Sequence, residues 1–188
     1  MSIYSNRLII LFYPDFRIMK TILLLAILFS NITLAQTTIY LLRHAEKQAG
    51  DNPSLTAIGK FRAQNITKQL ASVGISHIFS TNYKRTQQTV RPLADFLNLS
   101  IQNYDPRDLT TFAEQLKSLS GSILVVGHSN TTPELTTLLS QKKVGAIKEN
   151  EYDNLYQVIL DGDKIMLNRF RTIPSYLKLE TKIKTNDN

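Results

Sequence analysis

The stretch Ile39–Lys47, IYLLRHAEK, decides the fold and carries the first candidate site residues. Its apolar run, residues 39–42, is followed directly by Arg43 and His44. A short apolar run that ends in polar residues is typical of a buried strand. Buried parallel strands place their functional side chains just beyond their carboxyl ends. We therefore expect Arg43 and His44 at the edge of a sheet, where α/β proteins bind their ligands.

The rest of the chain alternates between strand-like and helix-like patterns. The expected strands are residues 37–42, 75–79, 99–104 and 122–126, with two further β-rich runs at 152–160 and 164–171. The expected helices begin near the cap residues Thr56, Asn82, Asp108 and Thr131. The turn Asp161-Gly162-Asp163 predicts that the last two strands form a hairpin. Strands that alternate with helices predict an α/β fold: a three-layer sandwich with a mostly parallel central sheet.

Some of these helices carry more detailed expectations. In the first, Ile58 is expected on the buried face. In the second, Pro92 is expected to kink the helix or to start a new one. In the third, we expect an apolar stripe formed by Leu109, Phe112, Ala113, Leu116 and Leu119. In the fourth, Thr131 and Glu134 have the spacing of a capping box.

The amino terminus has the pattern of a secretory signal peptide. Lys20 precedes an apolar run, residues 21–29, and small or polar residues lead to a cleavage site after Ala35. A membrane anchor is an alternative, but the run is shorter than the roughly 20 apolar residues that a span needs; a buried helix is another. Residues 1–18 are expected to be an upstream extension, with Met19 as an alternative start. We thus expect a secreted or periplasmic domain, residues 36–174, and a polar tail, residues 175–188.

Composition narrows the possible chemistry. The chain has 188 residues and no cysteine, which excludes disulfides, thiolate metal sites and cysteine nucleophiles. With three histidines in all, we expect no metal site and no cofactor. Without residues 1–35, which carry three basic residues and one acidic residue, the net charge falls from +7 to +5, and this modest positive charge suits an anionic ligand or a membrane surface. There is no dense basic stripe or nucleic-acid-binding motif, so we expect no nucleic-acid partner, and no stable membrane span after signal cleavage.

Two histidines and two arginines are predicted to meet at one sheet edge. The first strand ends in Arg43 and His44, the fourth ends before His128, and the second leads into a helix whose first turn carries Arg85. The carboxyl ends of parallel strands share an edge, so these side chains should form an anion pocket. Guanidinium groups match phosphate oxygens in a bidentate geometry, and helix amino termini add backbone donors.

A site that only binds phosphate would not need two histidines, so we expect them to take part in a reaction. A neutral imidazole is a nucleophile toward phosphorus, and cations around the other oxygens stabilise an in-line transfer. One histidine could attack phosphorus while the other donates a hydrogen bond. This scheme needs no metal.

Four sequence blocks resemble the histidine phosphatase superfamily, in its small, phosphoglycerate mutase-like branch. The blocks, in chain order, are Leu42-Arg43-His44-Ala45-Glu46, Leu55-Thr56 with Gly59, Arg85-Thr86-Gln87-Gln88-Thr89 and Val125-Val126-Gly127-His128-Ser129. The first departs from the usual Arg-His-Gly by having alanine in the third place. The resemblance spans about residues 37–139 and implies the phosphoglycerate mutase-like fold.

The resemblance also implies roles for individual residues. His44 would be the nucleophile and would pass through a phosphohistidine. Arg43, Arg85 and His128 would hold the phosphoryl oxygens. Ser129 and Asn130, which follow the second histidine, are expected either to contact substrate or only to cap a helix.

The proton donor is the point where the sequence departs from the family. Larger members place a glutamate after the third strand, a region that here contains Asp105. We expect Asp105 to donate the proton, although Asp-Pro is also ordinary turn chemistry. Glu46, two residues after the nucleophile, is a rival, and small members of the family lack an evident acid.

Together these patterns predict an exported, metal-independent phosphatase that hydrolyses a phosphomonoester through a phosphohistidine on His44. The expected substrate is a phosphorylated small molecule or an envelope sugar. The alternatives are a non-catalytic phosphate-binding module, a phosphoglycerate mutase and a phosphohistidine phosphatase. Export argues against a mutase, and the presence of both histidines argues against a binding module. The oligomeric state stays open.

Overall fold

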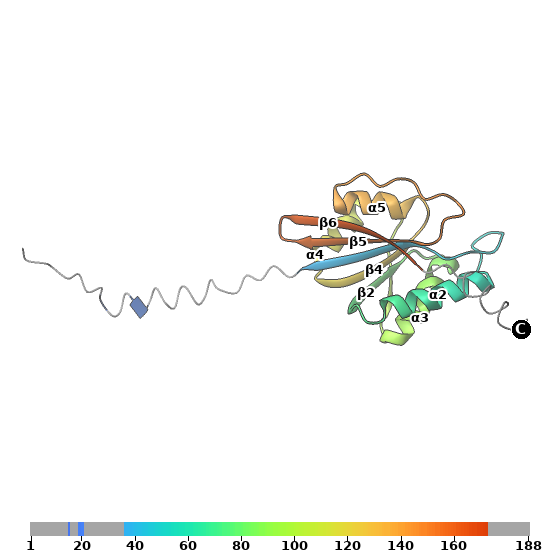
Figure 1. Cartoon of the computed structure of the whole chain (residues 1–188), viewed down its shortest axis with the longest axis horizontal. Helices are drawn as coiled ribbons and strands as arrows, with labels where there is room; N and C mark the ends of the chain where they lie inside the picture. Colours follow the sequence, from blue (N-terminus) through green and yellow to red (C-terminus); the bar gives the residue numbers. More distant parts are fainter. Residues whose placement is uncertain (1–14, 16–18, 21–35, 173–188) are drawn as a thin grey trace, which may run out of the picture. The chain divides into compact units, whose positions relative to one another are not determined.

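The computed structural model describes Asp15, Met19, Lys20 and residues 36–172 (Figure 1). Apart from those first three residues, the predicted upstream extension and signal peptide, 1–35, lie outside the described residues, as does the predicted tail, 175–188. Residues 36–172 belong to one compact unit of the chain. Within the described residues, no helix has both the length and the apolar character that a membrane crossing requires.

A mixed six-stranded sheet forms the centre of this unit. Its strands, in spatial order, are β3 (Ile101–Asn103), β2 (Ile75–Ser80), β4 (Gly121–Gly127), β1 (Thr37–Arg43), β5 (Asn154–Asp161) and β6 (Lys164–Arg171). The first four run parallel to one another, whereas β5 pairs antiparallel with β1 and with β6. The predicted α/β class, the mostly parallel sheet and the carboxyl-terminal hairpin are therefore confirmed.

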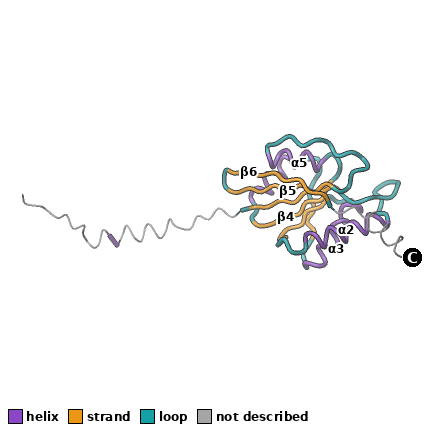
Figure 2. Tube along the Cα trace, viewed as in Figure 1, coloured by secondary structure: helices purple, strands orange, loops and turns teal. Residues whose placement is uncertain are grey.

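Helices cover both faces of the sheet and complete the three predicted layers (Figures 1 and 2). On one face lie α2 (Ala57–Leu70) and α3 (Lys84–Leu97). On the other lie α4 (Leu109–Ser118) and α5 (Thr131–Ser140). Each face has its own hydrophobic core, because apolar side chains of β1 and β4 point alternately to the two sides.

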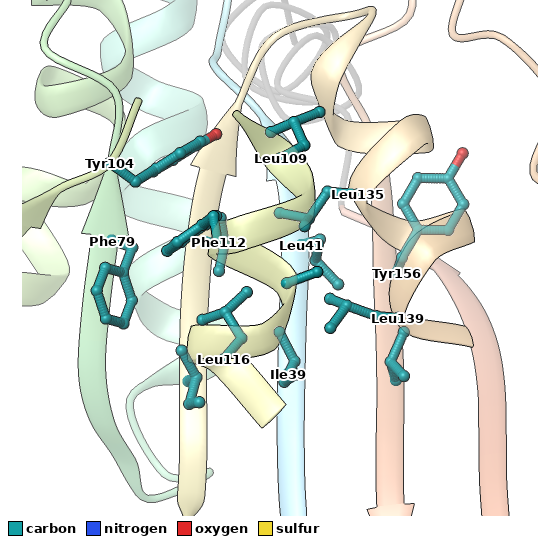
Figure 3. Packing of buried hydrophobic residues seen from close by; sticks show 14 of the residues in the cluster. Ile39, Leu41, Phe79, Tyr104, Leu109, Phe112, Leu116, Leu135, Leu139 and Tyr156 are labelled. Carbon is teal, nitrogen blue, oxygen red and sulfur yellow. The ribbon is translucent and has the colours of Figure 1, made fainter. Parts of the chain in front are cut away.

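The core beneath α4 fixes the loop that follows β3 (Figure 3). Phe112 stacks on Tyr104 with ring centroids 4.2 Å apart and meets Phe79 edge-on at 5.3 Å. Leu109, Ala113 and Leu116 are buried in the same cluster and the partly buried Leu119 packs against it, so the predicted apolar stripe is confirmed. Since Tyr104 directly precedes Asp105, this packing anchors the loop in which the predicted proton donor lies.

Two of the four predicted helix caps are confirmed. The hydroxyl of Thr56 accepts a hydrogen bond from the Gly59 N–H at the start of α2, and Asp108 accepts one from the Thr111 N–H at the start of α4. The other two predictions were wrong. Tyr83 rather than Asn82 precedes α3, without a side-chain cap.

At α5 the capping box does not form, because Thr131 lies inside the helix and Asn130 holds the cap position. The hydroxyl of Thr131 instead accepts a hydrogen bond from the His128 N–H at 2.9 Å. The Thr131 hydroxyl therefore stabilises the turn after β4, whereas the local sequence pattern had predicted that it would cap α5.

Two further expectations for α2 and α3 need correction. Ile58 is exposed, and the buried face of α2 instead includes the polar residues Arg62 and Asn65. Helix α3 runs through Pro92 as one element to Leu97, so Pro92 does not start a new helix, since a helix loses a single backbone hydrogen bond at proline and the surrounding core supports it; a kink there stays a prediction.

The strand register brings the predicted site residues to one edge. Arg43 pairs with Gly127 at the ends of β1 and β4, and Ser80 at the end of β2 pairs with Val126. The segments that follow these three strands therefore emerge together, as the sequence predicted.

Candidate active site

Helix α3 holds the loop that carries His44. The backbone N–H of Ala45 donates to the Thr89 hydroxyl at 2.9 Å, and that hydroxyl donates to the Arg85 carbonyl at 2.7 Å. The side-chain oxygen of Gln88 accepts from the backbone N–H of Leu55 at 2.8 Å. Gln88 and Thr89, both in the third sequence block, thus position the loops around the site.

His44 is a buried, neutral imidazole with one nitrogen available. Its side chain is 3% exposed, and Nδ1 lies 2.8 Å from the carbonyl oxygen of Ala45. A carbonyl only accepts, so Nδ1 carries the proton and Nε2 keeps its lone pair. Burial is the main cause that lowers the pKa of His44 to about 3; the Ala45 carbonyl opposes it, and the charges of Arg43, Arg85 and His128 add to it. At neutral pH the ring is therefore a competent nucleophile.

His128 lies beside His44, with ring centroids 5.7 Å apart. Its Nδ1 is 3.3 Å from Nη2 of Arg85, and its Nε2 is 3.0 Å from the Thr81 hydroxyl. A guanidinium only donates, so Nδ1 accepts and the Nε2 hydrogen points to Thr81. Burial, Arg85 and Arg43, in that order, lower the pKa of His128 to about 4.

Arg43 is held by a loop that the sequence analysis missed. Its side chain is 2% exposed, and its guanidinium lies 4.3 Å from the ring centre of Tyr152. Its Nη1 donates to the carbonyl oxygens of Lys148, Glu149 and Glu151 at 3.0, 2.9 and 3.2 Å. Its Nη2 lies 3.0 Å from the carboxylate of Glu149. The loop before β5 therefore orients the first arginine of the site.

The antiparallel direction of β5 explains why this loop reaches the site. Leu155, near the start of β5, pairs with Leu42, near the end of β1. The segment before β5 must therefore lie at the edge where Arg43 and His44 emerge. The predicted hairpin indicated that β5 and β6 are antiparallel strands. It did not indicate that β5 pairs with β1, because the pairing partner of a strand cannot be read from its own residues.

Two guanidinium nitrogens still lack an acceptor. Within the described residues, Nε of Arg43 and Nε of Arg85 are buried without a hydrogen-bond partner. Burial also lowers the pKa of Arg85, whose guanidinium lies 4.5 Å from the ring centre of Tyr83. Buried donors are almost always paired in proteins, so these two indicate a site built for an anion.

A cavity of about 360 Å³ brings the cationic and histidine residues together. It contains six of the residues predicted for the site, namely Arg43, His44, Arg85, His128, Ser129 and Asn130. Its other lining residues are Lys47, Tyr83, Pro106, Arg107, Thr131 and Glu149, of which Tyr83 and Glu149 were not predicted near the site. Asp105, which was also predicted, does not line it.

The geometry of Asp105 argues against its predicted role as proton donor. Its side chain is 47% exposed, and its two carboxylate oxygens accept from Nε and Nη2 of Arg107 at 2.9 and 2.8 Å. These hydrogen bonds lower the pKa of Asp105 to about 2. A carboxylate that stays ionised at neutral pH has no proton to give.

Glu46, the rival acid, is part of the scaffold. Its carboxylate accepts from Nη2 and Nε of Arg62 at 2.6 and 2.9 Å, and Arg62 Nη1 donates to the Thr172 hydroxyl at 3.2 Å. Helix α2 also comes so close that a side chain on Gly59 would overlap the carbonyl oxygen of Glu46. These contacts tie the loop after His44 to α2 and leave Glu46 outside the cavity lining.

Comparisons with known proteins agree with this geometry. The model of the histidine phosphatase superfamily (branch 1) matches residues 39–108. The probable phosphoglycerate mutases GpmB of Yersinia enterocolitica and of an Enterobacter species are 34% and 37% identical over 77 and 78 residues. In both cases the match covers 37% of this chain and 35% of the relative's length, so this chain spans about a third of the length of these relatives.

Solved structures resemble the chain over most of their length. The protein histidine phosphatase SixA, complexed with tungstate, covers 74% of this chain and 99% of its own, with a TM-score of 0.59 and 20% identity. A mycobacterial glucosyl-3-phosphoglycerate phosphatase covers 72% of this chain and 98% of its own, with a TM-score of 0.59 and 12% identity. The fold is therefore the phosphoglycerate mutase-like fold that the sequence predicted. Three of the four sequence blocks lie within residues 39–108, over which the chain is similar to branch 1 of the histidine phosphatase superfamily.

Proposed function

We propose that this protein is an exported phosphatase that hydrolyses a phosphomonoester through a phosphohistidine intermediate on His44. The observation that carries the proposal is the state of His44. Its neutral ring keeps a free Nε2 and lies in one cavity with Arg43, Arg85 and His128. Export rests only on the sequence pattern of residues 20–35.

The chemistry follows from the positions of these groups. The phosphoryl oxygens bind between Arg43 and Arg85, beside His128, and the two guanidinium groups stabilise the charge of the transition state. The lone pair of His44 Nε2 attacks phosphorus while the bond to the leaving oxygen breaks. Water then attacks the phosphohistidine and releases inorganic phosphate. Each step uses groups of this chain, and none requires a metal.

A phosphorylated small molecule, such as a phosphorylated sugar, is the substrate class we propose. The cavity of about 360 Å³ is large enough for a phosphoryl group and a small organic group. Lys47 and Arg107 line it beyond the two central arginines and suit an anionic substrate. One structural relative is named as a glucosyl-3-phosphoglycerate phosphatase, which supports a sugar-containing phosphate.

The test is hydrolysis of p-nitrophenyl phosphate by the purified protein in the presence of a chelator, beside a His44→Ala variant. We expect turnover by the wild type, which the chelator leaves unchanged, and none by the variant. Loss of turnover on chelation would contradict the metal-independent mechanism. If the folded wild type binds vanadate without any turnover, a non-catalytic phosphate-binding module explains the site better.

A phosphoglycerate mutase is the second candidate, because the curated relatives carry that name. A mutase returns the phosphoryl group to a second hydroxyl of the substrate, whereas a phosphatase gives it to water. Incubation with 3-phosphoglycerate separates the two activities. The proposal predicts inorganic phosphate as the product, and accumulation of 2-phosphoglycerate would favour the mutase.

A further inference from the structure

Glu149 brings a carboxylate into the cavity that the family resemblance did not predict. In the described part of the chain, it is the single acidic residue of the cavity lining. Its side chain is 75% exposed, and one carboxylate oxygen lies 3.0 Å from Nη2 of Arg43. A carboxylate therefore lies on the guanidinium that we expect to bind the phosphoryl group.

The exposure of Glu149 suits a role at the leaving oxygen. His44 is buried, and in-line transfer places the leaving oxygen opposite the attacking nitrogen. We take that oxygen to face the solvent side of the cavity, to which the Glu149 side chain, 75% exposed, has access. We propose that Glu149 donates the proton to the leaving oxygen and that the natural substrate is an alkyl phosphomonoester, the phosphate ester of an alcohol such as a sugar or polyol. This inference rests on the function proposed above.

The loop that carries Glu149 is fixed to the phosphoryl site through its backbone. The carbonyl oxygens of Lys148, Glu149 and Glu151 all accept from Nη1 of Arg43. The carboxylate of Glu151 in turn accepts from the Lys148 N–H and from the Asn154 side chain, both at 3.4 Å. The backbone on both sides of Glu149 is thus held at Arg43, and its exposed carboxylate lies beside the guanidinium that we expect to bind the phosphoryl group.

A substrate bound in the cavity lies among several charged groups besides Glu149. The other titratable or charged residues that face the cavity are His44, Lys47, Tyr83, Arg85, Arg107 and His128. Because Glu149 is exposed, water can deliver the proton directly.

The step balances in atoms and charge. The lone pair of His44 Nε2 forms the N–P bond, and the electron pair of the breaking P–O bond goes to the leaving oxygen. That oxygen takes the proton of the Glu149 carboxyl and departs as an alcohol. The Glu149 carboxylate then takes a proton from the water that attacks phosphorus. Cleavage of the N–P bond returns the electron pair to His44 and releases inorganic phosphate.

The need for this proton depends on the leaving group. An alkoxide is too basic to leave without a proton, whereas a nitrophenolate leaves as the free anion. A donor is therefore required for alkyl phosphates and dispensable for activated aryl phosphates. The two other acidic candidates, Asp105 and Glu46, do not line the cavity, and their ion pairs with Arg107 and Arg62 lie outside the phosphoryl-binding groups.

The experiment compares three esters of similar size, p-nitrophenyl, phenyl and benzyl phosphate, with the wild type and Glu149→Gln. The matched control is Glu114→Gln, which removes a carboxylate that is 69% exposed and ion-paired with Lys117 on α4, outside the cavity lining. We expect Glu149→Gln to lower kcat/KM for benzyl phosphate about 100- to 10,000-fold and that for p-nitrophenyl phosphate less than about threefold. Phenyl phosphate should fall between them, and the control should leave all three values unchanged.

Other outcomes would overturn the inference. An equal loss for all three esters would assign Glu149 to anion binding or to folding. A gain for all three would show that the carboxylate only competes with the phosphoryl group for Arg43. Wild-type turnover of p-nitrophenyl phosphate but not of benzyl phosphate would reject the proton donor and keep the phosphatase. Turnover of none of the esters by the wild type would reject the proposed function itself.

Discussion

At the scale of single residues, the hydroxyl of Thr89 links the proposed nucleophile to helix α3. It accepts from the Ala45 N–H and donates to the Arg85 carbonyl, so one side chain fixes the loop after His44 and the helix that carries Arg85. Thr89 belongs to the third sequence block, but nothing in the chemistry of a threonine signals this positioning role, and the sequence analysis assigned it none.

Replacement of Thr89 by valine tests this positioning. The shape is kept, but the buried Ala45 N–H loses its acceptor, which should lower the free energy of unfolding by about 1–3 kcal/mol. Displacement of His44 by a fraction of an ångström should also lower kcat/KM by about 10- to 100-fold. Urea unfolding and kinetics with p-nitrophenyl phosphate measure the two effects.

The matched control for that variant is Thr67→Val. Thr67 also donates to the carbonyl four residues before it, on α2, but it has no hydrogen bond to the site. It should keep full activity. If Thr89→Val also kept full activity, the positioning role of Thr89 would be wrong.

At the scale of elements, the ion pair between Glu46 and Arg62 joins α2 to the loop after β1. Arg62 is 4% exposed, so loss of its partner leaves a buried charge without compensation. We expect Glu46→Gln to lower the free energy of unfolding by about 3 kcal/mol. Its relative rates for p-nitrophenyl and benzyl phosphate should match those of the wild type, because Glu46 donates no proton. A selective loss for benzyl phosphate would instead make Glu46 the acid.

The close approach of α2 to the same loop predicts a second effect. A methyl group on Gly59 would overlap the backbone of Glu46, whereas the space around Gly145 is open. Gly59→Ala should therefore lower the free energy of unfolding by about 1–3 kcal/mol, and Gly145→Ala should not lower it. Thermal or urea unfolding of the two variants gives the comparison. Equal stability would show that α2 can move away without cost.

The elements also show what local sequence can predict. The predictions of the apolar stripe and of the cap of α4 were correct, because both features depend on residues within one or two helical turns. The cap of α5 and the buried face of α2 were not, because Thr131 serves the turn after β4 and Arg62 serves the pair with Glu46. The contact between Arg43 and Glu149, more than a hundred positions apart, has no local pattern at all.

At the scale of the whole molecule, the sheet order places two uncharged histidines among fixed positive charges. The pKa values of His44 and His128 are lowered to about 3 and about 4 from 6.5. Between these values and 6.5, the unfolded chain binds protons at both residues and the folded chain does not. The contribution of His44 and His128 to the free energy of unfolding is therefore fully present above pH 6.5 and is lost as the pH falls toward 4.

This linkage predicts acid sensitivity that depends on the two histidines. The urea midpoint of the wild type should fall between pH 7 and pH 4.5, and the fall should be smaller in a double variant, His44→Gln with His128→Gln. Other groups titrate in the same range, so the difference between the two proteins is the quantity to measure. Identical pH dependence in both would contradict the buried, neutral histidines.

The central claim is that His44 itself carries the phosphoryl group during turnover. The most direct measurement is to mix the protein with radiolabelled p-nitrophenyl phosphate, stop the reaction in alkali, which preserves phosphohistidine, and locate the label by peptide mapping. We predict label on His44 alone, formed with the first release of nitrophenolate, and none in His44→Ala. Label on another residue, or turnover that continues in His44→Ala, would contradict the mechanism.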